Sequence, residues 1–214
     1  MKKILVLGAG RSASVMIRFL LEHASEWNVV ITVGDQSAEL ANAKVNGHEK
    51  GTAVVFDALN ETQRRETVSQ HDIVVSMLPP QLHILVARDC IEFKKHLVTA
   101  SYVSNEMQQL NEDVKRAGLL FMCEMGLDPG IDHMSAMKVI HRIQQQGGTV
   151  NSFKSGTGGL VAPESDDNPW HYKVTWNPRN VILAGQGTAQ YLENGTKKFV
   201  PYHRLFTTTD RFKI

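Results

Sequence analysis

The residue types with the clearest chemical use lie near the amino end of the chain, where residues 8–13 have the pattern GxGxxA. Gly8 permits a sharp turn, Gly10 lets the backbone approach a pyrophosphate, and the small Ala13 lets a helix pack closely against a strand. The N–H groups at the start of such a helix can hold phosphate oxygens. We therefore predict a dinucleotide site formed by the whole segment. Its members are Gly8, Ala9, Gly10, Arg11, Ser12 and Ala13.

Acidic and apolar residues at later strand ends extend this prediction. Asp35 follows the glycines by about 20 to 25 residues, the spacing at which a carboxylate accepts hydrogen bonds from the adenine ribose. A carboxylate there repels a 2′-phosphate, so we expect NAD as the cofactor, with NADP as the alternative. Asp57 and Ala58 follow the third predicted strand on the adenine side, although an Asp in a turn explains Asp57 equally well. Leu78 ends the fourth strand on the nicotinamide side.

The substrate candidates follow the next two strands. Ser101 and Tyr102 come after the fifth predicted strand, so both should face the nicotinamide pocket. Asp128 and Pro129 come after the sixth, placed as the N-cap and the first residue of a helix. A capping role for Asp128 alone remains open. Asp128 is our first candidate for holding a substrate amine and relaying protons, with Tyr102 as its hydrogen-bond partner and His133 in reserve.

Apolar runs and amphipathic stretches alternate along the first 125 residues. This alternation predicts an α/β fold, a Rossmann-type doubly wound parallel sheet, at residues 1–125, followed by an incomplete α+β region at residues 126–214. The expected helices include residues 12–23 and 129–146. The six strands are expected at residues 3–7, 29–33, 53–56, 73–78, 97–99 and 119–123.

Composition and charge limit the classes of partner. The 214 residues are 42% hydrophobic and 21% charged with a net charge of +1, so neither disorder nor an overall field that attracts nucleic acid or a membrane is expected. Residues 170–214 hold seven Lys and Arg against two Asp and Glu, which suits either an anionic substrate or a solvated basic surface. Cys90 and Cys123 are predicted to be inert thiols in a reducing cytoplasm, and no metal site is expected.

Four segments carry a resemblance to a known family. These are TASY at residues 99–102, EMGLDPGIDHMSAM at residues 124–137, GGLVAPE at residues 158–164 and NPWHYKVTW at residues 168–176. Together they closely resemble saccharopine dehydrogenases. The resemblance implies NAD(P)-dependent interconversion of saccharopine with 2-aminoadipate semialdehyde and glutamate in lysine metabolism, and Asp35 favours the NAD-dependent, glutamate-forming direction. It also implies that Ser101, Tyr102 and Asp128 contact saccharopine, that Thr175 approaches the cofactor, and that residues 126–214 belong to a substrate-binding and dimerisation domain, compatible with a homodimer.

The chain departs from this family in two ways. Thr157 replaces a cysteine that the family usually has, which argues against an essential thiol. Family members are also about twice as long, as two-domain enzymes tend to be, so we expect a fragment. Two other functions therefore stay open: a reductive condensing enzyme similar to carboxynorspermidine dehydrogenase, and a catalytically silent NAD-binding fragment.

Other candidates divide between binding and structural roles. Arg179 is the first candidate to pair with a substrate carboxylate. Met134 and Met137 lie three residues apart and are expected in the core, and packing is also the favoured role for His133. Further cations are Lys173, His203 and Arg204, and the aromatic residues that wall a pocket or fill a core are Trp170, Tyr172 and Trp176.

Overall fold

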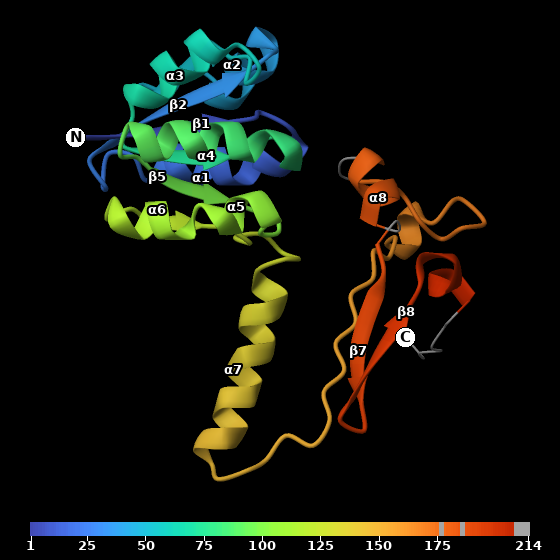
Figure 1. Ribbon diagram of the computed structural model, residues 1–214. Helices are drawn as coiled ribbons and strands as arrows, with labels where there is room; N and C mark the ends of the chain where they lie inside the picture. Colours follow the sequence, from blue (N-terminus) through green and yellow to red (C-terminus); the bar gives the residue numbers. More distant parts are fainter. Residues whose placement is uncertain (176–177, 185–186, 208–214) are drawn as a thin grey trace. The chain divides into compact units, whose positions relative to one another are not determined.

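The computed structural model describes residues 1–175, 178–184 and 187–207, and the chain divides into two compact units, Met1–Ser155 and Gly156–Ile214. The first unit is built around a six-stranded sheet in which every pairing is parallel (Figure 1). The strand order is β3-β2-β1-β4-β5-β6, the order of a dinucleotide-binding fold. The predicted fold class is thereby confirmed. The strands are β1 Lys2–Leu7, β2 Val29–Asp35, β3 Gly51–Val55, β4 Ile73–Ser76, β5 His96–Thr99 and β6 Phe121–Met122.

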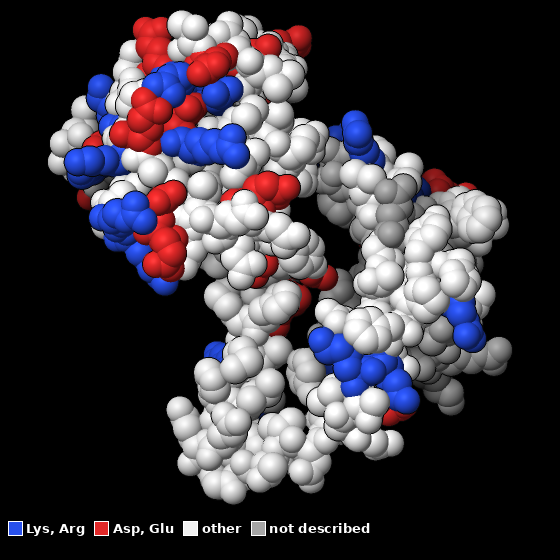
Figure 2. All heavy atoms as spheres, in the orientation of Figure 1, with Lys and Arg blue, Asp and Glu red and all other residues white. Residues whose placement is uncertain are grey.

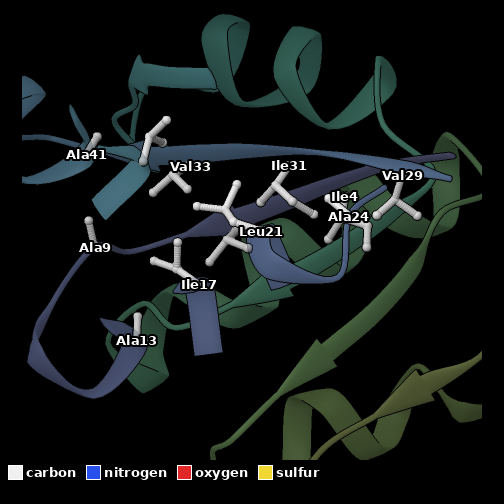
Figure 3. Packing of buried hydrophobic residues seen from close by; sticks show 12 residues of the cluster. Ile4, Ala9, Ala13, Ile17, Leu21, Ala24, Val29, Ile31, Val33 and Ala41 are labelled. Carbon is white, nitrogen blue, oxygen red and sulfur yellow. The ribbon is translucent and has the colours of Figure 1, made fainter. Parts of the chain in front are cut away.

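Alternate residues of the central strand β1 supply two separate cores, because successive side chains of a strand point to opposite faces. Ile4 and Val6 join the core under α1 (Ser14–Glu22) and α2 (Ala38–Val45). Leu5 and Leu7 join the core under three other helices, which are α3 (Glu61–Ser69), α4 (His83–Glu92) and α5 (Asn105–Gln109). Figure 3 shows Ile17 and Leu21 of α1 directed at the side chains of β1 and β2. Helices on both faces explain why the strands read as nearly continuous aliphatic runs.

Helices and short 3-10 turns connect the strands of the first unit. They are η1 Arg11–Ala13, α1 Ser14–Glu22, α2 Ala38–Val45, α3 Glu61–Ser69, η2 Pro80–Leu82, α4 His83–Glu92, α5 Asn105–Gln109, α6 Asn111–Arg116 and α7 Ile131–Gln145. Figure 2 shows acidic and basic side chains interspersed over the visible face of this unit, without a large patch of one sign. Within the described part of the chain, no helix is both long enough and apolar enough to cross a membrane.

The start of α7 differs from the prediction. Asp128 is not its N-cap and Pro129 is not its first residue, since the helix begins at Ile131 with Gly130 as the N-cap. The Gly130 backbone has φ +149°, and a Cβ there would collide with the carbonyl oxygens of Gly126 and Glu124, so the position requires glycine. The peptide bond between Asp128 and Pro129 is cis. The Asp128 side chain is exposed, and it does not cap α7.

Two further structural predictions for α7 are wrong. Met134 and Met137 are 55% and 44% exposed, so neither belongs to the core. His133 is also exposed, and its Nδ1 lies 2.7 Å from Oδ1 of Asp132 instead of packing between helices. The 3.6-residue apolar pattern of α7 is real, but no residue of this helix is buried in the described chain.

The second unit is a small mixed α and β region. Strands β7, Ala189–Glu193, and β8, Thr196–Val200, form an antiparallel hairpin. Asn194 and Gly195 connect them with positive φ angles of 49° and 74°, as a tight hairpin turn requires. The remaining elements are η3 Pro163–Ser165, α8 Pro178–Ala184 and η4 Tyr202–Thr207.

Candidate dinucleotide and substrate site

The predicted glycine turn lies at the switch point of the sheet, between the carboxyl ends of β1 and β4. Ligands of doubly wound folds gather at such points. Gly8 has φ +102°, and a Cβ on it would stand 2.9 Å from the carbonyl oxygen of Met77, just beyond β4. Gly10 has an extended backbone, and a Cβ there would meet no heavy atom within 4 Å among the residues that the structure describes, apart from its neighbours in the chain. Ala13 is buried against the sheet. The turn therefore packs through Gly8 and Ala13 and leaves Gly10 open to a ligand.

Asp35 connects the end of β2 to this turn. Its Oδ2 accepts a hydrogen bond from the Ala9 N–H at 2.7 Å, and its Oδ1 accepts one from the Ser37 N–H at 2.9 Å. The carboxylate is partly exposed beside the glycine turn, in the position where an adenine ribose is expected. Two backbone donors hold it in place before any ligand binds.

The other predicted cofactor residues have clear structural contacts. Asp57 accepts hydrogen bonds at Oδ1 from the Leu59 N–H and the Gln36 side chain, which is the turn role left open for it. Ala58 is buried in the second core, and its carbonyl oxygen accepts a bond from Arg64. Leu78 packs partly buried against the same core beyond β4. Their contacts with a cofactor stay predictions.

Tyr102 and Asp128 are brought together, although 26 residues separate them. The Tyr102 hydroxyl donates a hydrogen bond of 2.6 Å to Oδ1 of Asp128. This bond to a carboxylate raises the pKa of Tyr102 to about 12, with further contributions from burial and from the negative charges of Asp128, Asp132 and Glu124. The phenol thus stays protonated at neutral pH and acts as a donor. Tyr102 is 62% exposed, so the pair lies at the surface of the unit.

Glu124 supports the loop that carries this pair and was not among the predicted residues. Its carboxylate accepts a hydrogen bond from the Val103 N–H, and its own N–H donates to the Ser101 carbonyl oxygen. Its backbone has φ +62°, unusual for a non-glycine residue. The end of β6 thereby fixes the loop that follows β5.

Ser101 lies half-buried on that loop, and its hydroxyl contacts a residue that the sequence did not single out. Its Oγ is 2.8 Å from Nε2 of His83, the first residue of α4. His83 is buried, and desolvation lowers its pKa to about 4. One signal was available: His83 is a polar residue at the start of the helix that follows the fourth strand, with the apolar residues Leu82 and Ile84 beside it.

The two cysteines behave as predicted. Both are free thiols, Cys90 buried and Cys123 partly buried. Burial raises the pKa of each thiol, so neither is poised as a nucleophile. Among the residues that the structure describes, no group of His, Cys, Asp and Glu side chains is arranged to hold a metal ion.

The remaining candidates belong to the second unit. Thr175 and Arg179 are exposed on it, and their roles toward cofactor and substrate stay predictions. Lys173 pairs with Asp167 at 2.9 Å. Trp170 is 83% exposed, so a core role for it is wrong. Trp176 lies outside the described residues. The other members of this set, Tyr172, His203 and Arg204, are in the described part of the unit.

Comparison with known proteins gives two family matches that together cover nearly the whole chain. Residues 4–122 match the saccharopine dehydrogenase NADP binding domain, and residues 126–214 match the saccharopine dehydrogenase C-terminal domain. The saccharopine dehydrogenase (NADP+, L-glutamate-forming) of Schizosaccharomyces pombe is 39% identical over 91% of this chain and 43% of its own length. The alpha-aminoadipic semialdehyde synthase of Arabidopsis thaliana is 40% identical over 99% of this chain and 21% of its own length.

A solved structure agrees with these relatives. The apo saccharopine dehydrogenase (L-Glu forming) of Saccharomyces cerevisiae superimposes with a TM-score of 0.87 and 33% identity, over 100% of this chain and 47% of that one. The chain thus spans about half the length of these fungal relatives.

Proposed function

We propose the following function for this chain, which belongs to the saccharopine dehydrogenase family. The protein binds a nicotinamide dinucleotide along the glycine turn and contributes the residues that oxidise saccharopine to 2-aminoadipate semialdehyde and glutamate. The observation that carries this proposal is the hydrogen bond between Tyr102 and Asp128 at the carboxyl edge of the sheet. A dinucleotide that starts at Gly8 would bring its reactive ring toward this edge.

The reaction sets requirements that this pair meets. Saccharopine is a secondary amine, which must lose its ammonium proton before a hydride can leave the neighbouring carbon. The bound nicotinamide supplies the hydride acceptor. The resulting imine adds water, and the carbinolamine then collapses with proton transfers to nitrogen.

Asp128 and Tyr102 take different parts in these steps. Tyr102 occupies one carboxylate oxygen of Asp128, which leaves the second oxygen as an acceptor for the substrate ammonium group. Because its phenol stays protonated, Tyr102 orients the carboxylate and is not the base. Asp128 therefore holds the amine and receives its proton. The nearby carboxylates Glu124 and Asp132 add negative charge that favours a cationic amine.

We further propose that NAD is preferred over NADP. Asp35 is held beside the turn by two backbone N–H groups, and the three residues that follow it are uncharged. A 2′-phosphate would meet a fixed carboxylate there, whereas ribose hydroxyls would find an acceptor. The S. pombe and S. cerevisiae relatives carry NADP+ in their names, so this preference would distinguish the chain from them.

The reaction is tested by following NADH formation from saccharopine, with calorimetric titration of NAD and NADPH on the same samples. Both measurements use the 214-residue chain and the longest chain that its gene encodes. Turnover in either form supports the dehydrogenase. Dinucleotide binding without turnover in both would favour a silent binding module, and turnover with a polyamine precursor instead would favour the carboxynorspermidine type.

Two substitutions test the role of Asp128 in turnover and the role of Asp35 in cofactor preference. Asp128→Asn keeps the side-chain shape but removes the charge, so it should lower turnover while NAD affinity stays the same; loss of NAD binding would show that Asp128 is misplaced. Asp35→Asn retains one acceptor oxygen and should shift the ratio of NAD to NADP affinity by about tenfold toward NADP, or about 1.4 kcal/mol. An unchanged ratio would contradict the proposed preference.

A further inference from the structure

His83 occupies an unusual place for a titratable residue. It is the first residue of α4, directly after the short turn η2 that follows β4. Only 3% of its surface is exposed. A buried imidazole needs hydrogen-bond partners for both of its nitrogens, and those of His83 come from two neighbouring strands and the loop after the second of them.

Three hydroxyl groups surround the ring. Nδ1 lies 2.8 Å from Oγ of Ser76, the last residue of β4. Nε2 lies 2.8 Å from Oγ of Ser101 and 3.1 Å from Oγ1 of Thr99, the last residue of β5. One side chain thus connects the carboxyl ends of β4 and β5 to the loop that bears Ser101 and Tyr102.

This arrangement does not suit proton transport. The chain of contacts runs inward from Ser101 to Ser76, which is fully buried and has His83 as its only side-chain partner in the described chain. Burial lowers the pKa of His83 to about 4, so the ring is neutral at pH 7. A neutral ring carries a single N–H, so one nitrogen donates and the other accepts.

Ser76 is fully buried and has a single side-chain partner among the described residues, which favours the tautomer in which Nε2 of His83 carries the hydrogen. A buried hydroxyl with one partner is better satisfied when it donates its hydrogen, because an unused buried donor is costly. In this tautomer Ser76 donates to Nδ1, and the N–H on Nε2 faces two hydroxyl oxygens, that of Ser101 at 2.8 Å and that of Thr99 at 3.1 Å. The shorter of the two contacts is the one to Ser101. The Ser101 oxygen then accepts from the ring, and its own hydrogen is left to bond a ligand.

We propose that His83 is a positioning residue that fixes the Ser101 hydroxyl as a hydrogen-bond donor to a carboxylate of the substrate. This inference rests on the proposed function, because it assigns Ser101 a substrate that bears carboxylates. Ser101 lies beside Tyr102 in the chain, so a substrate held at its amine by Asp128 would reach both residues from one loop.

Two substitutions of His83 distinguish the contact of Nε2 with Ser101 from the contact of Nδ1 with Ser76. Gln places an amide N–H near the position of Nε2 and should keep the bond to Ser101, whereas Asn reaches only toward Ser76. We expect His83→Gln to keep KM for saccharopine within about threefold of wild type, and His83→Asn to raise it by about tenfold. The affinity for the dinucleotide should not change in either variant.

Ser101→Ala serves as the reference. It should raise KM as His83→Asn does, and the double variant should be no worse than Ser101→Ala alone, because His83 acts through that hydroxyl. Three results would each overturn the proposal. The first is a KM in the double variant that exceeds the KM of Ser101→Ala, and the second is an equal rise in KM in the His83→Gln and His83→Asn variants. The third is a loss of dinucleotide affinity that accompanies the rise in KM.

An NMR experiment tests the same contact and requires neither turnover nor a stable His83→Asn variant. In the 15N NMR spectrum of the wild-type protein at pH 7, His83 should have a protonated Nε2 and an unprotonated Nδ1, and Ser101→Ala should shift the Nε2 signal. A protonated Nδ1, or no response to Ser101→Ala, would refute the orientation. If wild-type protein oxidises no saccharopine, the proposed function fails, and these spectra still judge the contact between His83 and Ser101.

Discussion

The two glycines of the turn after β1 should respond differently to the same added methyl group. In Gly8→Ala, the new Cβ would stand 2.9 Å from the carbonyl oxygen of Met77, and the residue would have to hold a φ of +102°. A left-handed backbone costs a residue with a side chain about 1–2 kcal/mol, and displacing the contacting backbone adds a similar amount. We expect a total loss of about 3 kcal/mol, which lowers Tm by about 6–12 °C in a domain of this size.

Gly10→Ala is the matched control. The Gly10 backbone has φ −65° and ψ 179°, which any residue adopts, and, its chain neighbours aside, a Cβ there meets no heavy atom of the described residues within 4 Å. Stability should therefore change by less than about 0.5 kcal/mol. The methyl group would instead occupy the space through which a pyrophosphate approaches the turn, so NAD affinity should fall by about tenfold or more.

Both effects can be measured on the same samples. Thermal unfolding followed by circular dichroism without cofactor reports stability, and calorimetric titration reports NAD affinity. The two glycines do not have these separate roles if Gly10→Ala lowers Tm as much as Gly8→Ala does, or if Gly10→Ala binds NAD as tightly as the wild-type chain.

Three further predictions concern buried and paired groups. Asp128→Asn should return the Tyr102 pKa from about 12 toward its ordinary value, as followed by NMR of the ring carbon that bears the hydroxyl; an unchanged pKa would show that another group sets it. Asp89→Ala leaves the buried guanidinium of Arg64 without the carboxylate 2.6 Å away and should cost about 3–5 kcal/mol in denaturant unfolding, and a loss below about 1 kcal/mol would contradict that view. Because the His83 pKa is lowered by folding to about 4, the unfolded chain takes up this proton first, so stability should fall as pH drops from about 6.5 to 4, by about 3 kcal/mol in total. The His83→Gln variant should lack the part of this pH-dependent loss that comes from His83. An identical pH dependence of stability in that variant would contradict the assignment of the loss to His83.

The sheet and its turn were predictable because their signals are local. Each strand of a sheet covered on both faces appears as an aliphatic run, and Gly8 must be glycine because of its φ angle and the close approach of Met77. The position of Asp35 follows from the length of one strand, helix and strand unit. The residue types and spacings that reveal these features lie within short stretches of sequence, although the contact of Gly8 with Met77 forms only in the folded sheet.

The wrong or missing predictions concern residues whose environment is set by contacts with distant parts of the chain or by irregular turns. Asp128 followed by Pro129 has the pattern of a helix start, yet Gly130 is the N-cap and the helix begins at Ile131. The periodicity of α7 predicted burial of Met134, but periodicity gives only a face and not what covers it. His83 was missed because its three partners come from residues 76, 99 and 101, a convergence that only the folded sheet creates.

The most direct test of the central claim is a crystal structure of the protein with NADH and saccharopine bound. We expect the pyrophosphate against the glycine turn at residues 8–13 and the nicotinamide ring facing the paired side chains of Tyr102 and Asp128. The substrate nitrogen should lie within hydrogen-bond distance of the Asp128 carboxylate. A nicotinamide ring directed away from that loop, or a substrate amine held by other residues, would contradict it.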